Sequence, residues 1–306
     1  MRFARSSFLL IALLMAGTVH AAGPRDALVV DATWLAQHIN DPDLVLLHVG
    51  DPSKYAARHL PNARAITMQD VSISDHSGQG LMLEMPPADD LRRRLAALGI
   101  SDTSRVIVYA AQGWVSPTTR VLFTLDYAGL GAPTSVLDGG LDAWVRAGQT
   151  VTDVVPAPRQ GTLSPLKLRP IVVDAAYVRE RLKDPKVSLV DGRASSFYDG
   201  VETGGSHDGP HKTGHIAGAR SIPFTEIVDE RNVLRPAAEL KALFAKAGVK
   251  EGDTVIGYCH IGQQTTVMLF AARTLGHNVL LYDGSFEDWS RHKDYPVEGA
   301  AKKDHR

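Results

Sequence analysis

The chain has 306 residues, 44% of them hydrophobic, and a formal net charge of −1. A nearly neutral chain offers no basic field for nucleic acid or an anionic membrane, so we expect neither as a partner. The apolar content is sufficient for substantial cores, and the length favours two domains over one. A single cysteine, Cys259, excludes an internal disulfide.

The first residues predict export. A basic start precedes an apolar stretch over residues 8–16, which is too short to span a bilayer. We expect a signal peptide over residues 1–22, cleaved after Ala21 or Ala22, with an uncleaved anchor as the alternative. The mature protein would then be periplasmic, without membrane contact. Its formal charge would be −3, since cleavage removes two arginines from a chain of charge −1.

Residues 27–150 alternate helix-like and strand-like stretches, a pattern typical of a parallel α/β domain. In chain order they contain a helix-like stretch, an apolar strand, a His-Leu-Pro-Asn-Ala-Arg motif, a second apolar strand, and an Asp-Gly pair before a tryptophan, at residues 32–39, 44–49, 59–64, 105–110 and 136–144. A linker is expected over residues 151–170, where four prolines and little periodicity indicate an extended, semi-rigid segment.

Residues 171–300 repeat the same order of features. The corresponding stretches are residues 174–182, 187–190, 215–220, 254–259 and 280–289. We therefore predict the α/β fold class, with two tandem domains that each form a parallel sheet flanked by helices.

The two halves differ at one chemically important position. When Tyr109 is aligned with Tyr258, Ala110 falls opposite Cys259, so the first half lacks the cysteine. The stretch from position 110 to the closing tryptophan covers 34 positions, against 30 in the second half, and we assign the extra length to the loop after Ala110. Because ligands of open α/β sheets bind at the carboxyl ends of the strands, we expect the first half to cover the crevice of the second.

Cys259 follows a short apolar strand, residues 255–258, and precedes a helix expected from Thr265. A thiol at such a junction faces the unpaired N–H groups and the positive dipole of the first helical turn, which favours a thiolate nucleophile and an anion at the sulfur. Gly262 would supply a backbone conformation closed to other residues, and Thr265 would either cap the helix or donate its hydroxyl to the sulfur. The amides expected to surround the anion are those of His260, Ile261, Gly262, Gln263, Gln264 and Thr265.

Several motifs together resemble the tandem-domain sulfurtransferases of the rhodanese superfamily, over nearly the whole mature chain. They are Leu189-Val-Asp-Gly-Arg193, Gly214-His-Ile-Ala-Gly-Ala219, the Cys259 loop, Asp283-Gly-Ser-Phe-Glu-Asp-Trp289 and His59-Leu-Pro-Asn-Ala63. The resemblance implies that Cys259 takes a sulfane sulfur from thiosulfate or 3-mercaptopyruvate, holds it as a persulfide, and passes it to a thiol, cyanide or a reduced protein. It implies no cofactor.

The resemblance also suggests supporting residues. Asp191 and Arg193 would form an ion pair that braces the loop, with direct substrate contact as the alternative. His215 would be a turn or supporting histidine rather than a general base. His59, its first-half counterpart, could face the crevice across the domain interface.

The loop departs from the family's patterns. His260 and Ile261 stand where thiosulfate-using members tend to carry an Arg-Lys pair, Phe197 stands where a second arginine would fall, and the Cys-Gly-Ser-Gly pattern of mercaptopyruvate enzymes is absent. His260 would either contact substrate or shape the rim. Neither donor is therefore favoured, and a persulfide carrier that serves one dedicated partner is the alternative function.

Two other kinds of site lack support. A cysteine phosphatase needs an arginine six positions after the cysteine to hold a phosphate dianion, and Thr265 stands there. His207, His211 and His215 are spaced by four, but the glycines and the proline between them prevent a regular helix, so we expect no metal site.

Overall fold

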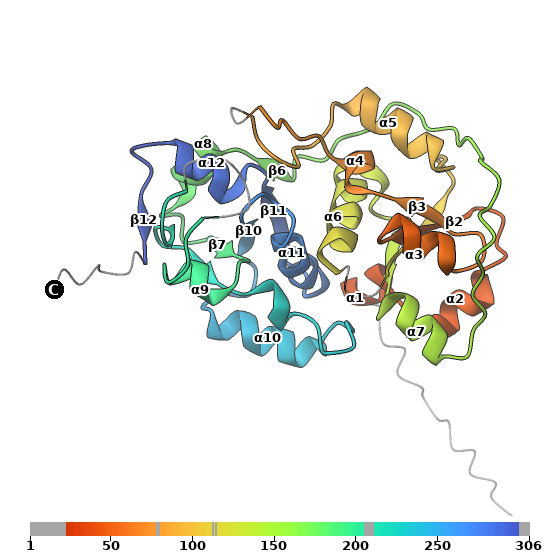
Figure 1. The fold of residues 1–306 in the computed structure, drawn as a ribbon. Coiled ribbons are helices and arrows are strands. Elements are labelled where there is room, and N and C mark those ends of the chain that lie inside the picture. Colours follow the sequence, from red (N-terminus) through yellow and green to blue (C-terminus); the bar gives the residue numbers. More distant parts are fainter. Residues whose placement is uncertain (1–22, 78–79, 112, 114, 205–210, 300–306) are drawn as a thin grey trace, which may run out of the picture.

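The structure is a computed structural model that describes residues 23–77, 80–111, 113, 115–204 and 211–299. Over these ranges the chain forms two α/β domains that lie side by side (Figure 1). The expected signal peptide, residues 1–22, and most of the histidine-containing segment, residues 205–210, lie outside the described residues.

Five parallel strands build the sheet of the first domain, in the order β1-β5-β4-β2-β3. They are β1 (Val29–Val30), β2 (Leu44–Val49), β3 (Arg64–Ile66), β4 (Arg105–Ala110) and β5 (Thr134–Leu137). The helices are α1 (Pro24–Leu28), α2 (Ala32–His38), α3 (Pro52–Ala57), α4 (Met68–Val71), α5 (Ala88–Ala97), α6 (Val115–Leu125) with its π-helical continuation Asp126–Leu130, and α7 (Gly140–Arg146). Every connection between consecutive strands of this sheet carries a helix, as parallel pairing requires.

The second domain repeats this sheet in the order β6-β11-β10-β7-β9, again with parallel pairing. Its strands are β6 (Val172–Val173), β7 (Val187–Asp191), β9 (Arg220–Ser221), β10 (Thr254–Tyr258) and β11 (Asn278–Tyr282), with a separate antiparallel pair of β8 (His215–Ile216) and β12 (Val297–Glu298). The helices are α8 (Ala175–Arg181), α9 (Ser195–Tyr198), a 3₁₀ turn at Phe224–Glu226, α10 (Ala237–Lys246), α11 (Thr265–Thr274) and α12 (Ser285–Arg291). The predicted fold class is confirmed.

The duplication extends to single hydrogen bonds. The hydroxyl oxygen of Tyr109 in β4 accepts from the Leu60 amide, and that of Tyr258 in β10 accepts from the Ile216 amide, both at 3.1 Å. Both tyrosines are fully buried. The shared contacts support the alignment that places Ala110 opposite the cysteine.

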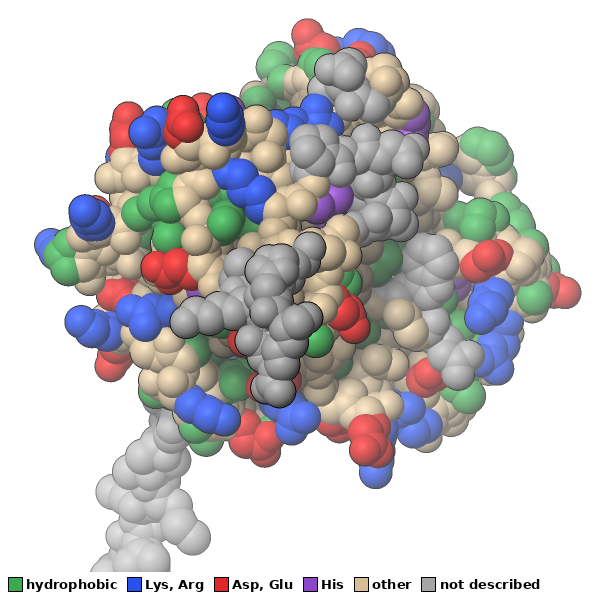
Figure 2. All heavy atoms as spheres, turned by 60° about the vertical axis from the view of Figure 1, so that its left-hand side comes forward, with side chains coloured by type: hydrophobic (Ala, Val, Ile, Leu, Met, Phe, Trp, Pro, Cys, Tyr) green, Lys and Arg blue, Asp and Glu red, His purple; other side chains and the backbone are tan. Residues whose placement is uncertain are grey.

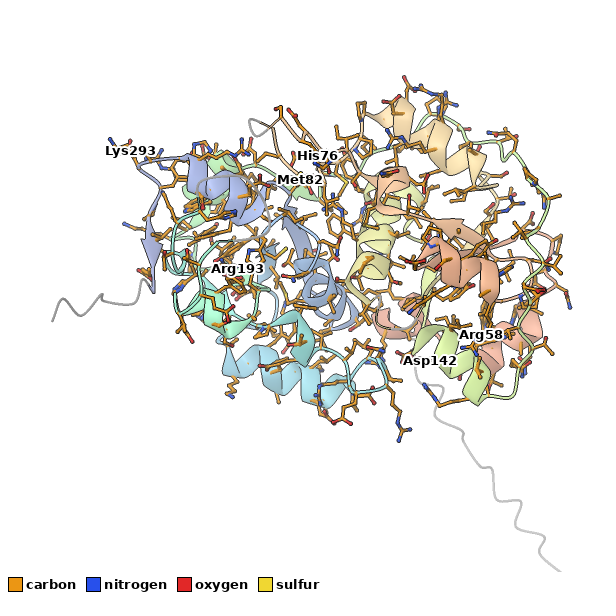
Figure 3. The ribbon with its side chains drawn as sticks, viewed as in Figure 1. Arg58, His76, Met82, Asp142, Arg193 and Lys293 are labelled. Carbon is orange, nitrogen blue, oxygen red and sulfur yellow. The ribbon has the colours of Figure 1, made fainter. Side chains whose placement is uncertain are left out.

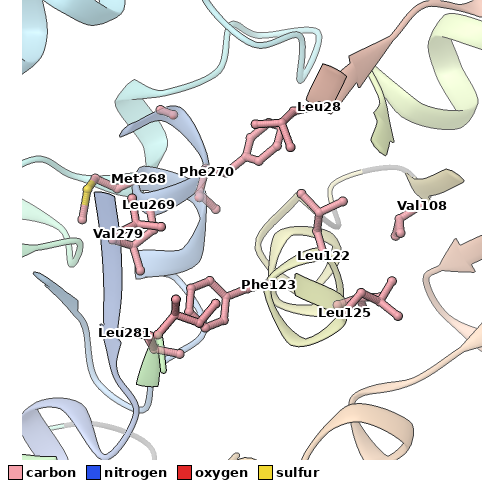
Figure 4. Close-up of a cluster of buried hydrophobic side chains, with 14 of the residues drawn as sticks. Leu28, Val108, Leu122, Phe123, Leu125, Met268, Leu269, Phe270, Val279 and Leu281 are labelled. Carbon is pink, nitrogen blue, oxygen red and sulfur yellow. The ribbon is translucent and has the colours of Figure 1, made fainter. Parts of the chain in front are cut away.

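A continuous hydrophobic cluster joins the two domains through α6 and α11, the helices that follow β4 and β10. Figure 4 shows Leu122 and Phe123 of α6 together with Phe270 of α11, Leu281 of β11 and Leu28 of α1. None of these side chains is more than 7% exposed. Because this core crosses the domain boundary, apolar packing holds α6 beside α11.

The extra length of the first half lies in a helix, and its assignment to the loop after Ala110 is wrong. Residues 111–114 separate β4 from α6, whereas residues 259–264 separate β10 from α11. The first-half helix instead runs on into Asp126–Leu130, a segment kinked at Gly129, whose backbone is left-handed (φ +85°). Buried Asp126 in that segment pairs with Arg169 and with Arg273 of α11 (3.1 Å), so the added segment gains partners at the domain boundary.

The face shown in Figure 2 carries basic and acidic side chains interspersed with one another. This agrees with the small net charge and gives that face no field of a single sign. In the part of the chain that the structure describes, no helix combines the length and the apolar character needed to cross a membrane.

Gly257 in β10 sets the distance between the sheet and α11. A β-carbon at this position would lie 2.6 Å from Thr265 Oγ1 and 2.8 Å from Leu269 Cδ2, closer than packed atoms approach. We expect Gly257→Ala to lower the free energy of unfolding by about 1–3 kcal/mol, because the helix must move off the sheet. Urea unfolding measures this change.

The double variant Gly257→Ala/Leu269→Ala is the control for this contact. Truncation of Leu269 makes room for the new methyl group, so the combined loss of stability should be smaller than the sum of the two single losses. Additive losses would contradict the proposed contact.

Candidate active site

Cys259 lies directly after β10, in a loop of residues 259–264 that ends where α11 begins. The residue is 1% exposed. Since β10 is the central strand of its sheet, the thiol lies at the carboxyl edge, where open α/β sheets bind ligands.

The carbonyl groups of the loop are bonded to its surroundings. Three of them accept from donors outside the loop: Cys259 O from Phe286 N (3.0 Å), His260 O from Glu287 N (3.1 Å) and Gly262 O from Arg120 Nη1 (2.9 Å). In a trans peptide the carbonyl oxygen and the following amide hydrogen point in opposite directions. Fixing these carbonyls therefore turns the amides of residues 260, 261 and 263 away from those partners and into the loop.

Five consecutive amides of the loop region donate to no residue that the structure describes, namely those of Ile261, Gly262, Gln263, Gln264 and Thr265. Bonding resumes one residue later, from Thr266 N to Gln263 O and from Val267 N to Gln264 O, both at 3.1 Å. The amides of Gln264 and Thr265 lie at the N-terminus of α11, where donors lack partners inside the helix and the helix dipole adds positive potential, and the other three belong to the loop just before it. Together they form a setting suited to an anion.

Gly262 is required within this loop. Its backbone is left-handed (φ +78°), and a β-carbon there would lie 2.7 Å from Asp283 O and 3.0 Å from Arg120 Nη1. Both the conformation and the close approach exclude a side chain, which is the role expected of this glycine.

Ser285, the first residue of α12, holds the backbone of the cysteine itself. Its hydroxyl accepts from Cys259 N (3.2 Å) and donates to Tyr282 O (2.9 Å). Ser285 is fully buried and has a left-handed backbone (φ +52°), which is uncommon for a residue with a side chain. Sequence reasoning missed this role, although the residue lies within the Asp-Gly-Ser-Phe motif.

Thr265 does not cap the helix, because Gln264 occupies the cap position and Thr265 is the first helical residue. Its fully buried hydroxyl lies beside Gly192 and Gly257 and has no hydrogen-bond partner in the described ranges. The geometry leaves the other predicted role open, which is donation of the hydroxyl to an anion at the sulfur.

Asp191 and Arg193 form a buried ion pair, and Figure 3 shows Arg193 inside the second domain. Arg193 Nη2 lies 2.6 Å from Asp191 Oδ2 and donates to Gly214 O (2.7 Å). Burial acts to lower the pKa of Arg193, but the Asp191 carboxylate outweighs it, and Cys259 adds to the net rise. The guanidinium carbon also lies 4.2 Å from the centre of the Phe286 ring. Arg193 packs against the Phe286 ring, and the Phe286 amide donates to the Cys259 carbonyl. The ion pair is therefore placed to brace the loop.

His215 and His59 occupy equivalent positions in the two domains. The Nδ1 atom of each lies 2.7 Å from the backbone carbonyl oxygen of the tyrosine on which the ring stacks, Tyr198 for His215 and Tyr55 for His59. This geometry favours the structural role for His215. The expectation that His59 faces the crevice is wrong, because the residue is fully buried in its own domain and its Nε2 lies 3.2 Å from Val154 O.

The rim of the loop is formed by contacts from both domains. His260 packs edge-on against Phe197, with ring centres 4.6 Å apart. Gln263 Nε2 donates to Ser116 Oγ of α6 (3.2 Å), and Ile261 is half-buried. The first domain therefore borders the loop directly.

The first domain has lost charge as well as the cysteine at its equivalent site. Its strand register places His48 where the second domain has Asp191. Burial, aided by His59, lowers the pKa of His48 to about 4, so the imidazole is neutral at pH 7. Gly50 stands in place of Arg193.

Two acidic residues, buried Asp283 and half-buried Glu84, lie near each other between the domains. Asp283 accepts from Arg120 Nη1 (2.7 Å) and from Met85 N (2.8 Å). Burial, together with the charge of Asp283, raises the pKa of Glu84 to about 8. No group of three or more histidines, cysteines or acidic residues within the described ranges could hold a metal ion. Sequence reasoning missed Arg120 and Glu84, because no motif marks contacts between distant segments.

The rhodanese-like domain family matches this chain twice, at residues 31–147 and 174–292. The chain belongs to the rhodanese family. It is similar to a thiosulfate sulfurtransferase of Pseudomonas aeruginosa (29% identity, covering 89% of this chain and 97% of the relative) and to the 3-mercaptopyruvate sulfurtransferase of Escherichia coli K12 (28%, 88% and 97%). The predicted class, a tandem rhodanese-type sulfurtransferase, is confirmed.

Two further similarities add context for this rhodanese. A sulfur carrier protein of Thermus thermophilus is 26% identical, over 88% of this chain and 95% of its own length. The fold also matches that of an anaerobic ergothioneine biosynthesis enzyme from Chlorobium limicola, with a TM-score of 0.78 and 21% identity over 90% of this chain and 70% of that one. At that identity the likeness concerns the fold alone.

Replacement of Ser285 tests its hold on the cysteine backbone. We expect Ser285→Ala to lower the free energy of unfolding by about 1–3 kcal/mol, because Cys259 N is left buried without an acceptor. Ser285→Gly removes the same hydroxyl but suits the left-handed backbone, so it should be less destabilising than alanine. Chemical denaturation compares the three proteins, and an alanine variant as stable as wild type would rule out the hydroxyl's role.

Glu84 predicts a pH-dependent stability. Its pKa is about 8 in the folded protein, against an ordinary 4.5, so the native state keeps a proton that the unfolded chain releases. The contribution of Glu84 to stability should therefore fall as pH rises from about 4.5 to about 8. Glu84→Gln cannot lose this proton, so its stability relative to wild type should increase over that interval.

Urea midpoints measured across that pH interval provide the test. Glu230→Gln is the matched control, because Glu230 is exposed and should show a constant difference from wild type. A Glu84→Gln difference that is equally constant with pH would refute the buried, protonated carboxyl.

Proposed function

We propose that this protein transfers sulfane sulfur through a persulfide on Cys259. The observation that carries the proposal is the row of five open amides that follows the chain's single cysteine. A persulfide ends in a charged sulfur atom, and amides of fixed direction stabilise such a charge without further rearrangement.

Two half-reactions account for the transfer. The thiolate of Cys259 attacks the outer sulfur of thiosulfate, the S–S bond breaks, and sulfite leaves with the bonding electrons. With 3-mercaptopyruvate the thiolate attacks the thiol sulfur, the C–S bond breaks, and the thiol proton ends on the carbon of the released pyruvate. An acceptor thiolate or cyanide then attacks the outer sulfur of the persulfide, and the Cys259 thiolate leaves.

Different groups around Cys259 support different parts of the transfer. Open amides from Ile261 to Thr265 surround the transferred sulfur, and the Thr265 hydroxyl adds a further donor. The pair of Asp191 and Arg193 braces the loop from behind. Burial of Cys259 keeps water from the persulfide, because the residue is 1% exposed.

The candidate donors and acceptors come from the relatives and from the residues of the loop. The relatives named above include enzymes for thiosulfate and for 3-mercaptopyruvate. The loop carries no lysine or arginine, and His260 meets Phe197 at the rim. A loop without lysine or arginine also suits a persulfide carrier for one protein partner, which is the second candidate, and the Thermus relative is named a sulfur carrier protein. We further propose export to the periplasm, on the order of residues in the first 22 positions.

A donor screen scored by mass tests the function. Incubation with thiosulfate or 3-mercaptopyruvate should add one sulfur atom to wild type and none to Cys259→Ser, with release of one equivalent of sulfite or pyruvate. Turnover with cyanide or a thiol should fall by at least about 1,000-fold in the serine variant.

The same screen separates the two candidates. Fast loading with rapid release to a free thiol supports the enzyme, whereas fast loading with release only to a partner protein supports the carrier. Absence of sulfur uptake from either donor by wild type would refute both.

A further inference from the structure

Arg120 of the first domain reaches the loop that holds Cys259. It lies in α6 and is fully buried. Its Nη1 atom donates to Gly262 O (2.9 Å) and to Asp283 Oδ1 (2.7 Å), and its Nη2 atom donates to Leu83 O. A single guanidinium thus contacts the loop, the segment that precedes α12, and its own domain.

The contact with Gly262 fixes the direction of one peptide group. The Gly262 oxygen is held toward Arg120, so the Gln263 N–H in the same planar peptide points the opposite way. Gln263 N is the middle one of the five open amides. The other two outward carbonyls of the loop are held by backbone donors of α12, so Arg120 is the side chain that completes the set.

The guanidinium is itself fixed in place. Asp283 binds Arg120 through one carboxylate oxygen and accepts from Met85 N through the other, at 2.8 Å. Gly262 has no side chain, and a β-carbon there would lie 3.0 Å from Arg120 Nη1, so the arginine approaches the loop as closely as a glycine allows. Because the buried guanidinium is bonded both to Asp283 and to the Gly262 carbonyl, it is held in one position relative to the loop.

We propose that Arg120 is a positioning residue for sulfur transfer. Through the Gly262 carbonyl, the domain that has no nucleophile keeps the amides aimed at the sulfur on Cys259. The sulfur-loading part of this inference rests on the proposed function, whereas the reactivity of the thiol does not.

The test compares Arg120→Met with Arg273→Met. Arg273 pairs with Asp126 of the first domain (3.1 Å) from the far end of α11, so its loss also breaks an ion pair between the domains without touching the loop. Alkylation of Cys259 by iodoacetamide and single-turnover loading from thiosulfate or 3-mercaptopyruvate are measured on both variants. We expect Arg120→Met to slow both reactions by about tenfold to 100-fold. The slower loading should appear in the maximal rate at saturating donor and not in the donor concentration that gives half of that rate.

Further variants separate positioning from stability. Arg273→Met should stay within about twofold of wild type in both rates. Arg120→Lys retains one charged donor and should recover part of the loss. Arg120→Met/Asp283→Asn removes the buried charge pair together, so it should fold better than Arg120→Met yet remain slow.

Three results would overturn the proposal. They are wild-type rates in Arg120→Met, equal slowing in Arg273→Met, and wild-type rates in the double variant. Should Arg120→Met fail to fold, Arg120→Lys and the double variant decide the matter alone. Failure of wild type to load sulfur would refute the proposed function instead, and the alkylation rates would still decide whether Arg120 acts on the thiol.

Discussion

The site depends on the direction of three peptide groups. The carbonyls of Cys259, His260 and Gly262 are held outward by two amides of α12 and one guanidinium of α6, so the amides that follow them point inward. The loop would not keep this arrangement without those donors, because unpaired amides before a helix are otherwise satisfied by water or by side chains. Donors supplied by two other segments therefore fix the direction of amides before α11, and the proposed sulfur transfer rests on that arrangement.

The two domains show how a duplicated fold divides its tasks. Both keep the buried tyrosine that accepts from a backbone amide and the histidine stacked on a tyrosine, because these contacts hold the sheet edge in either copy. The first domain has a neutral His48 where the second has Asp191, and alanine where the second has its cysteine. The first domain instead contributes Ser116 and Arg120, which contact Gln263 and Gly262 of the neighbouring loop.

The repeat, the parallel sheets and the junction at Cys259 could be predicted because they leave local patterns: apolar strands, turn motifs and a cysteine between strand and helix. Gly262 was predictable for the same reason. Arg120 was not, because 142 positions separate it from Gly262 and no spacing rule links the two. The extra length of the first half was expected in the wrong segment for another reason. The number of positions between Ala110 and Trp144 does not show whether a loop or a helix contains the added residues. The buried position of His59 depends on its stacking against Tyr55, a contact that the sequence motif does not reveal.

The hydrophobic cluster shared by α6 and α11 has a consequence for the chain as a whole. Leu122 and Phe270 belong to one core although they lie in different domains. Separating the halves would leave both of these helices with a bare apolar face in water, so neither half is a self-sufficient module. The duplicated chain should accordingly melt in one cooperative step, with the loop that holds Cys259 losing its order together with the first domain.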